Sequence, residues 1–142
     1  MLRSLLLLLM LFTASFQSLA ENKQSSSYEN IIGKYTYTQQ GDELIDGKNA
    51  SITWVLNFLP EGEVKVSITS WHAPFTCDGL YQTEKDNNEI KLTWLSGEGS
   101  EMECDTQPPQ FIAKQNTGTI LLIKSSLFPW DDEKWFALNK IN

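Results

Sequence analysis

The sequence predicts an all-β fold, an antiparallel up-and-down barrel of seven or eight strands, with a two-sheet β-sandwich as the second choice. Three observations predict it. After Ile31, apolar and polar residues alternate in short runs, and turn-forming residues interrupt these runs at regular intervals. Beyond the first twenty residues, no segment shows the 3.6-residue period of an amphipathic helix. A barrel and a sandwich produce the same alternation, so the pattern alone does not separate them.

The clearest strands lie in the middle of the chain. Residues 52–58, 64–69 and 89–94 each place apolar side chains at every second position. A strand with this pattern turns one face to a core and the other to water. The segment Pro60-Glu61-Gly62 then makes a tight turn between the first two of them.

Two further hairpins are predicted from their turns, because Asn, Asp and Gly tolerate the positive φ that tight turns require. Residues 85–88 join a strand around Tyr81 to the strand at 89–94. Residues 116–118 join a strand at 111–114 to one at 119–124. The last apolar run, residues 134–141, is expected to close the sheet against a first strand near Tyr35.

The first twenty residues predict a secretory signal peptide. Arg3 precedes an unbroken apolar run at 5–12, and Ser18-Leu19-Ala20 is a small-x-small cleavage pattern. The run is too short to span a bilayer, which needs roughly 20 apolar residues. We therefore expect a periplasmic or secreted chain, cleaved near Ala20 and without membrane insertion. Residues 21–30 are polar and predict a flexible arm, and residues 31–142 predict a single β-domain.

The charge balance restricts the partners. The net charge is −7, and the only arginine, Arg3, lies in the predicted signal peptide. The mature chain would hold ten lysines against 18 acidic residues, a charge of −8. Arginine is the usual bidentate ligand of phosphate, so nucleic acid and phosphorylated ligands are poor candidates. A negative field attracts cationic partners, and we expect a basic protein.

The two cysteines predict a disulfide. Cys77 and Cys104 are the only cysteines, and an even number in an exported chain indicates pairing. A redox motif would favour a C-x-x-C spacing, which is absent. Two cysteines with the single histidine, His72, do not complete a zinc tetrahedron, so we expect no metal site.

Short motifs at both ends of the predicted barrel resemble a known group of proteins. Gly33-Lys34-Tyr35 resembles the Gly-x-Trp opening of lipocalin-like (calycin) barrels, and Trp135-Phe136-Ala137-Leu138 resembles their final strand. The order of elements is also similar across most of the mature chain. The resemblance implies a small secreted barrel, a group that includes carriers of small ligands and bacterial periplasmic inhibitors with one disulfide.

The sequence shows no motif that is typical of a catalytic site. Nucleophilic catalysis requires a Ser or Cys beside a His that a carboxylate orients, and His72 has Ser70 and Asp78 nearby. However, there is no Gly-x-Ser-x-Gly elbow, and both cysteines are expected to be oxidised. A lone histidine beside Trp71 is typical of a surface residue. We therefore expect no catalytic residue, no cofactor and no enzymatic activity.

Two loops carry large apolar residues among turn-formers. They are residues 71–75 and 127–132, and a proline in each interrupts strand pairing. Aromatic residues beside charges are typical of protein-binding hot spots, although the same residues could plug the ends of a barrel. The candidate partner-binding residues are Trp71, His72, Phe75, Phe128, Trp130, Asp131 and Asp132.

The predicted function is therefore binding rather than catalysis. We expect a protein-binding inhibitor, or an immunity-type protector, directed against a cationic enzyme such as a wall hydrolase or a protease. The alternative is a carrier of a small apolar ligand. Its cavity would be lined by Tyr35, Trp54 and Trp94, which the alternation places inside the barrel.

Overall fold

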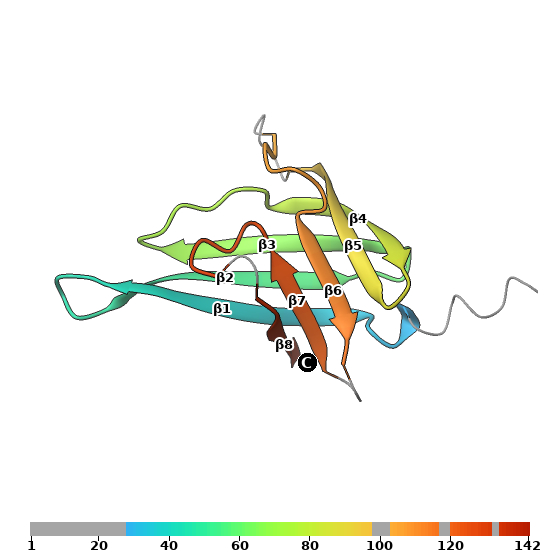
Figure 1. Ribbon diagram of the computed structural model, residues 1–142, viewed down its shortest axis with the longest axis horizontal. Helices are drawn as coiled ribbons and strands as arrows, with labels where there is room; N and C mark the ends of the chain where they lie inside the picture. The colour runs from blue at the N-terminus through green and yellow to red at the C-terminus, as the bar shows by residue number, and fades with distance from the viewer. Residues whose placement is uncertain (1–27, 98–102, 117–119, 132–133) are drawn as a thin grey trace, which may run out of the picture.

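A computed structural model describes residues 28–97, 103–116, 120–131 and 134–142 (Figure 1). The described chain forms one closed antiparallel barrel of eight strands in sequence order, which confirms the barrel and excludes the sandwich. The predicted signal peptide, and residues 21–27 of the predicted arm, lie outside the described residues. The strands are β1 (Gly33–Glu43), β2 (Asn49–Phe58), β3 (Glu63–Trp71), β4 (Gly79–Asp86), β5 (Glu89–Ser96), β6 (Phe111–Gln115), β7 (Leu121–Ser125) and β8 (Phe136–Ile141).

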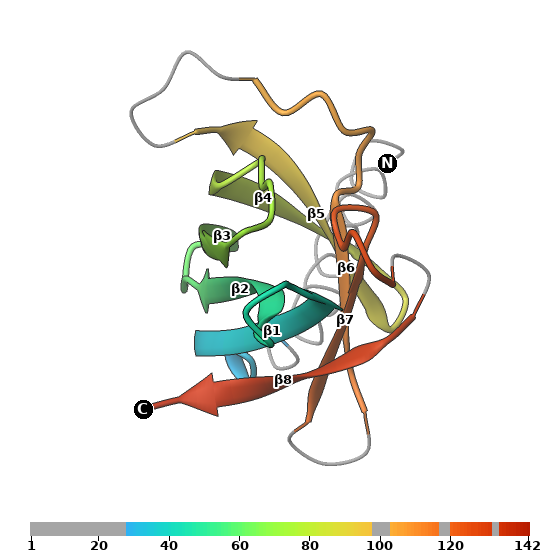
Figure 2. The same ribbon diagram turned by 90° about the vertical axis from the view of Figure 1, so that its left-hand side faces the viewer.

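The barrel closes where the sequence predicted, between the last strand and the first. β8 pairs with β1 in an antiparallel ladder, with Tyr35 opposite Lys140. This pairing joins residues from the two ends of the domain, and Figure 2 shows the resulting ring of strands. Closure removes the two open edges that a flat sheet of these strands would expose.

Because the strands run up and down in sequence order, successive connections alternate between the two ends of the barrel. The connections β1–β2, β3–β4, β5–β6 and β7–β8 all lie at one end. We call this end the loop end and include in it the two residues of each strand that adjoin these connections. The other three connections lie at the opposite end, the turn end. Figure 1 shows the β1–β2 hairpin extending well beyond the rest of the barrel at the loop end.

Side chains fill the interior of the barrel. Alternate residues of β2 are buried, from Ala50 to Phe58, as the period-two pattern predicted. Aromatic rings pack edge to face inside, with centroid distances of 5.7 Å between Tyr35 and Phe58 and 5.4 Å between Tyr81 and Phe111. Such pairs contribute about 0.5–1.5 kcal/mol beyond the burial of their area. The interior is thus a packed core.

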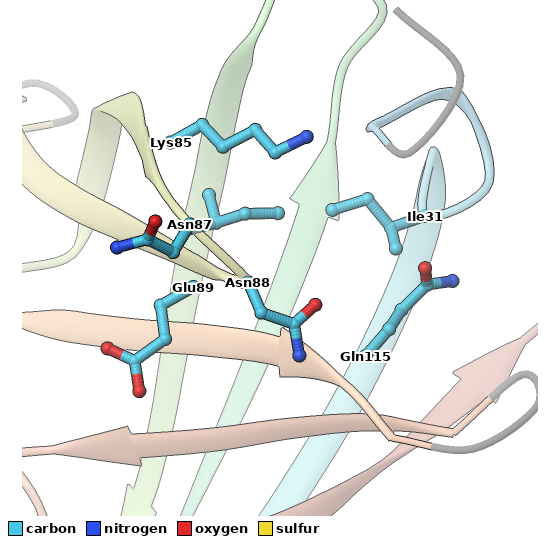
Figure 3. Close-up of a pocket in the computed structure, with 7 residues that line it drawn as sticks. Ile31, Lys85, Asn87, Asn88, Glu89 and Gln115 are labelled. Carbon is cyan, nitrogen blue, oxygen red and sulfur yellow. The ribbon is translucent and has the colours of Figure 1, made fainter. Parts of the chain in front are cut away.

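A short turn before β1 covers the turn end. Residues 28–30, predicted as part of the flexible arm, instead form a helical turn in which the Tyr28 hydroxyl donates to the Glu63 carbonyl oxygen at 3.2 Å. Ile31 follows and is buried in the core. Beside it lies a hollow of about 60 Å³, shown in Figure 3, whose polar lining comes mainly from the β4–β5 turn. Apolar anchors at Tyr28 and Ile31 explain the difference from the predicted arm.

Candidate functional site

The two aromatic loops predicted from the sequence meet at the loop end. The β3–β4 loop (residues 72–78) and the β7–β8 connection (residues 126–135) lie on either side of a pocket of about 230 Å³. The barrel supplies its inner wall, and the loops supply its rim. The lining residues are Ile52, Trp54, Pro74, Phe75, Thr76, Leu127 and Pro129.

The two loops place their phenylalanines differently. Phe75 lies on the pocket rim with 49% of its surface exposed, so it is open to a partner. Phe128 is only 1% exposed and contacts Trp54, with 4.7 Å between ring centroids. A side chain this buried contacts no partner in this conformation. Phe128 therefore plugs the barrel, and Phe75 is the exposed phenylalanine of the two.

Trp130 anchors the β7–β8 connection to the β1–β2 hairpin. Its ring lies so close to Gly41 that a Cβ added there would fall 1.9 Å from Trp130 Cζ2. Only glycine leaves room for this contact. The neighbouring Asp131 forms an ion pair with Lys134 at 2.5 Å. Asp132, also predicted as a contact residue, lies outside the described residues.

Trp71 and His72 do not line the pocket. Their rings contact each other edge to face with 4.3 Å between centroids, and the Lys48 ammonium lies 5.7 Å from the Trp71 ring. His72 is exposed and has a φ of 53°, which fits the sharp exit from β3. Among the described residues, no hydrogen bond joins His72 to Ser70 or Asp78, the two residues that the sequence places near it.

The predicted disulfide is confirmed. Cys77 and Cys104 are bonded, with 4.9 Å between their Cα atoms, and the bond joins the β3–β4 loop to the β5–β6 connection. Beside it, the Trp94 indole donates to the Asp78 carbonyl oxygen at 3.0 Å, and the Tyr81 hydroxyl donates to the Cys77 carbonyl oxygen. These contacts fix the base of the loop that carries Phe75.

A buried polar network holds the opposite loop, and the sequence reading missed it. The Ser125 hydroxyl donates to the Gln110 carbonyl oxygen at 2.5 Å and accepts from the Leu127 amide at 3.0 Å. The Gln110 side chain donates to the Thr106 carbonyl oxygen and accepts from the Trp94 amide, both at 2.8 Å. Each buried polar group of this network thereby has a partner, so the network stabilises the β5–β6 and β7–β8 connections. No sequence motif marks these residues.

Gln39 was also missed, and its side chain is unsatisfied. It is 4% exposed, and neither its amide nitrogen nor its amide oxygen has a hydrogen-bond partner among the described residues. It follows Tyr35 and Tyr37 on the inward face of β1, and its cross-strand neighbour on β2 is Ile52, a pocket residue. The alternation of β1 could have identified Gln39 as an inward-facing residue, because position 39 falls on the apolar face.

Burial and nearby charge raise the pKa of two tyrosines. In the middle of β1, burial, and then the negative charge of Asp131, raise the pKa of Tyr37 to about 12. At the turn end, burial raises the pKa of Tyr28 to about 12, with Glu61 and Glu63 adding to the shift. Both side chains therefore stay neutral at physiological pH and act as apolar packing groups with a hydroxyl donor.

Charge is distributed unevenly between the two ends. The described loop end carries seven carboxylates and three lysines, a formal charge of −4, whereas the rest of the described chain carries six of each. Two of those three lysines already pair with aspartates, Lys48 with Asp46 and Lys134 with Asp131. The loop-end carboxylates are Asp42, Glu43, Asp46, Asp78, Glu103, Asp105 and Asp131.

The three residues of the predicted ligand cavity do not share one cavity. Tyr35 is buried against Phe58, and Trp94 is half-buried beside the disulfide loop. Only Trp54 lines the loop-end pocket, where it forms part of the inner wall. The pocket thus lies at the mouth of the barrel, over a filled interior.

Comparisons with known proteins add no relative: no family model, curated protein or solved structure matches the chain. The described residues contain no group of three His, Cys, Asp or Glu side chains placed to hold a metal ion. Within the same residues, no helix is long and apolar enough to cross a bilayer.

Proposed function

We propose that this protein is a secreted or periplasmic, non-enzymatic binding protein that uses its loop end to inhibit, or protect against, a cationic protein. One observation carries the proposal. The exposed Phe75, an apolar pocket and an excess of carboxylates all lie on the same end of a barrel whose interior is filled. An aromatic anchor surrounded by charge is the usual composition of a protein-binding hot spot.

The charge distribution supports a basic partner. A face with a formal charge of −4 opposite a neutral one orients an approaching cationic protein toward the loops. Such steering raises the association rate and falls with ionic strength. A wall hydrolase or protease with a basic surface is the class of target that fits, and the disulfide is compatible with an exported chain.

The loops are held firmly enough to act as a preformed surface. The Cys77–Cys104 bond fixes the base of one loop, and the hydrogen bonds of Ser125 fix the other. A surface that is already ordered loses less conformational entropy on binding, so more of its contact energy becomes affinity.

Inhibition and direct binding test the proposal together. The oxidised mature chain would be titrated against a panel of basic wall hydrolases and basic proteases, with activity and calorimetry measured on the same samples. We expect at least one target to be bound and inhibited, with affinity falling as salt rises. A panel in which nothing is bound or inhibited would refute the proposal.

A matched pair of variants locates the binding face. Phe75 and Ile120 are both apolar and both 49% exposed, but Phe75 lies at the loop end and Ile120 at the turn end. Phe75→Ala should weaken binding about tenfold or more, the loss expected for an aromatic hot spot. Ile120→Ala should leave the affinity nearly unchanged. Equal effects of the two variants would place the interface elsewhere.

A carrier of a small apolar ligand is the second candidate, favoured by the apolar lining of the loop-end pocket. Pockets for drug-sized ligands measure about 300–1,000 Å³, and this one is smaller, at about 230 Å³. Titration with fatty acids, followed by tryptophan fluorescence, distinguishes the two candidates. Saturable binding of a long-chain acid would favour the carrier.

A further inference from the structure

The β1–β2 hairpin projects beyond the rest of the barrel as a two-stranded finger. β1 pairs with β8 only at residues 34–36, and β2 pairs with β3 no further than Ser51. Within the described chain, residues 41–50 therefore pair with no third strand, and we call them the finger. At about 3.4 Å per residue, the four steps from Gly41, where Trp130 packs, to Ile45 span roughly 13 Å (Figure 1).

The tip of the finger carries the most exposed large apolar side chain of the described residues. Ile45 is 109% exposed, whereas Phe75 and Ile120 follow at 49% each. A side chain fully in water contributes no packing to the fold, so its replacement costs the free protein almost no stability. With Lys48 included, the finger has a formal charge of −2, because it holds three carboxylates: Asp42, Glu43 and Asp46.

Hydrogen bonds hold the tip in one conformation. The Leu44 amide donates to the Lys48 carbonyl oxygen at 2.7 Å, and the Gly47 amide donates to the Leu44 carbonyl oxygen at 2.9 Å. Gly47 has a φ of 78°, so these bonds describe a three-residue loop with glycine in the left-handed conformation, a common hairpin geometry. The Lys48 amide also donates to a carboxylate oxygen of Asp46 at 3.1 Å. An ordered turn therefore holds Ile45.

The base of the finger is held as well. The Asn49 side-chain amide donates to the Gly41 carbonyl oxygen at 2.8 Å, across the two strands. The Trp130 ring lies against Gly41, and the Lys48 ammonium lies 5.7 Å from the Trp71 ring. The finger is thereby joined to the β7–β8 connection and to the end of β3. Because it is already ordered, it loses little conformational entropy when its tip is bound.

The shape of the loop end requires a hollow in the partner. Figure 1 shows the finger reaching past the β3–β4 loop, which carries Phe75. A flat surface that contacts Ile45 would stand away from Phe75, whereas a cleft about as deep as the finger is long accommodates both. Substrate sites of enzymes are hollows of this kind, mostly apolar inside.

We propose that Ile45 enters the substrate cleft of the cationic enzyme, where its side chain fills an apolar subsite. The finger carboxylates would then pair with lysine or arginine at the entrance of the cleft. This inference rests on the proposed function and specifies how inhibition is achieved, because the finger takes the place of the substrate. The partner that it describes is an enzyme with an open cleft, an apolar subsite and a basic rim.

Inhibition kinetics with a short substrate test the finger. The oxidised mature protein would be titrated against each basic enzyme that it inhibits, with a substrate small enough to occupy only the cleft. We expect competitive inhibition, because the finger and the substrate exclude each other. Ile45→Ala should raise the inhibition constant about tenfold or more, the loss expected for a hot spot. Ile45→Asp should raise it further, because it places a charge in an apolar subsite.

An exposed isoleucine at the turn end supplies the matched controls. Ile120→Ala and Ile120→Asp make the same changes far from the finger, and they should leave the inhibition constant nearly unchanged. Urea unfolding of all four variants checks the fold. Since Ile45 is fully exposed, its variants should keep the unfolding midpoint of the unmodified protein. A loss of inhibition without a loss of stability then belongs to the contact with the enzyme.

Two outcomes would overturn the proposal. If Ile45→Ala inhibits as strongly as the unmodified protein, the tip of the finger is not buried in the complex. If inhibition is noncompetitive with the short substrate, the finger lies outside the cleft. Either result leaves the proposed function standing wherever Phe75→Ala still weakens binding of the same enzyme, so the two failures are distinguishable. A panel in which no basic enzyme is bound or inhibited removes both proposals.

Discussion

Phe128 provides the sharpest test of how the loop end is built. Its ring contacts four others from different strands, with centroid distances of 5.2 Å to Tyr37, 4.7 Å to Trp54, 6.1 Å to Phe111 and 5.7 Å to Phe136. Because it is 1% exposed, replacing it with alanine removes an aromatic ring from a closed core and leaves a cavity at the mouth of the barrel.

The expected loss follows from these contacts. Phe→Ala in a core lowers the free energy of unfolding by about 3–5 kcal/mol. Four ring contacts place Phe128→Ala in the upper half of that range, at about 4–5 kcal/mol, since each aromatic pair adds to the burial term. Domains of this size are stable by about 5–15 kcal/mol, so the variant should still fold, with a much smaller margin.

Urea unfolding followed by tryptophan fluorescence measures the loss, with the slope compared between variants to check two-state behaviour. Phe75→Ala is the control, because Phe75 lies in the facing loop and is half exposed. It should cost less than about 1 kcal/mol. A loss below about 1 kcal/mol for Phe128→Ala would mean that Phe128 is not a plug, and the assignment of roles between the two phenylalanines would be wrong.

Three further predictions concern the supports of the same end. Replacing Cys77 and Cys104 together by serine should lower the free energy of unfolding by about 3–4 kcal/mol, from the 27-residue separation of the pair, and urea unfolding measures it. Gly41→Ala should cost about 1–3 kcal/mol and shift the tryptophan emission, because its Cβ collides with Trp130; an unchanged spectrum would contradict that contact. Above pH 10 the melting temperature should fall: an unfolded tyrosine ionises near pH 10, whereas Tyr37 in the folded protein ionises near 12. The stability from Tyr37 is complete below pH 10 and is lost between pH 10 and 12, and Tyr37→Phe should flatten this decline.

The sequence was sufficient to predict the strands, because the alternation of apolar and polar residues that identifies a strand is a local pattern. The buried positions of β2 and β3 are the alternate apolar residues, which any strand with one buried face must show. Choosing the barrel over a sandwich depended on the pairing of β1 with β8, a contact between the ends of the domain. The apolar run after residue 134 indicated that pairing without establishing it.

The candidate site could be predicted only in part from the sequence. Both loops looked alike in sequence, each with a proline beside large apolar residues, yet Phe128 is buried and Phe75 is exposed. That difference depends on distant strands whose side chains enclose one ring and leave the other open. Gln39 was accessible to reasoning, because it continues the inward period of Tyr35 and Tyr37, although nothing local showed that its amide lacks a partner.

If the loop end is the binding face for a cationic protein, removing negative charge there should slow association, and matched charge variants measure this effect. Glu103→Gln with Asp105→Asn removes two exposed charges at the loop end, and Glu61→Gln with Glu84→Gln removes two exposed charges elsewhere. Association rates with an inhibited basic enzyme would be measured at low and physiological salt. We predict that the loop-end pair slows association severalfold and weakens its salt dependence, while the other pair changes neither. Equal rates for both pairs, or a larger effect from Glu61 and Glu84, would show that the loop end is not the binding face.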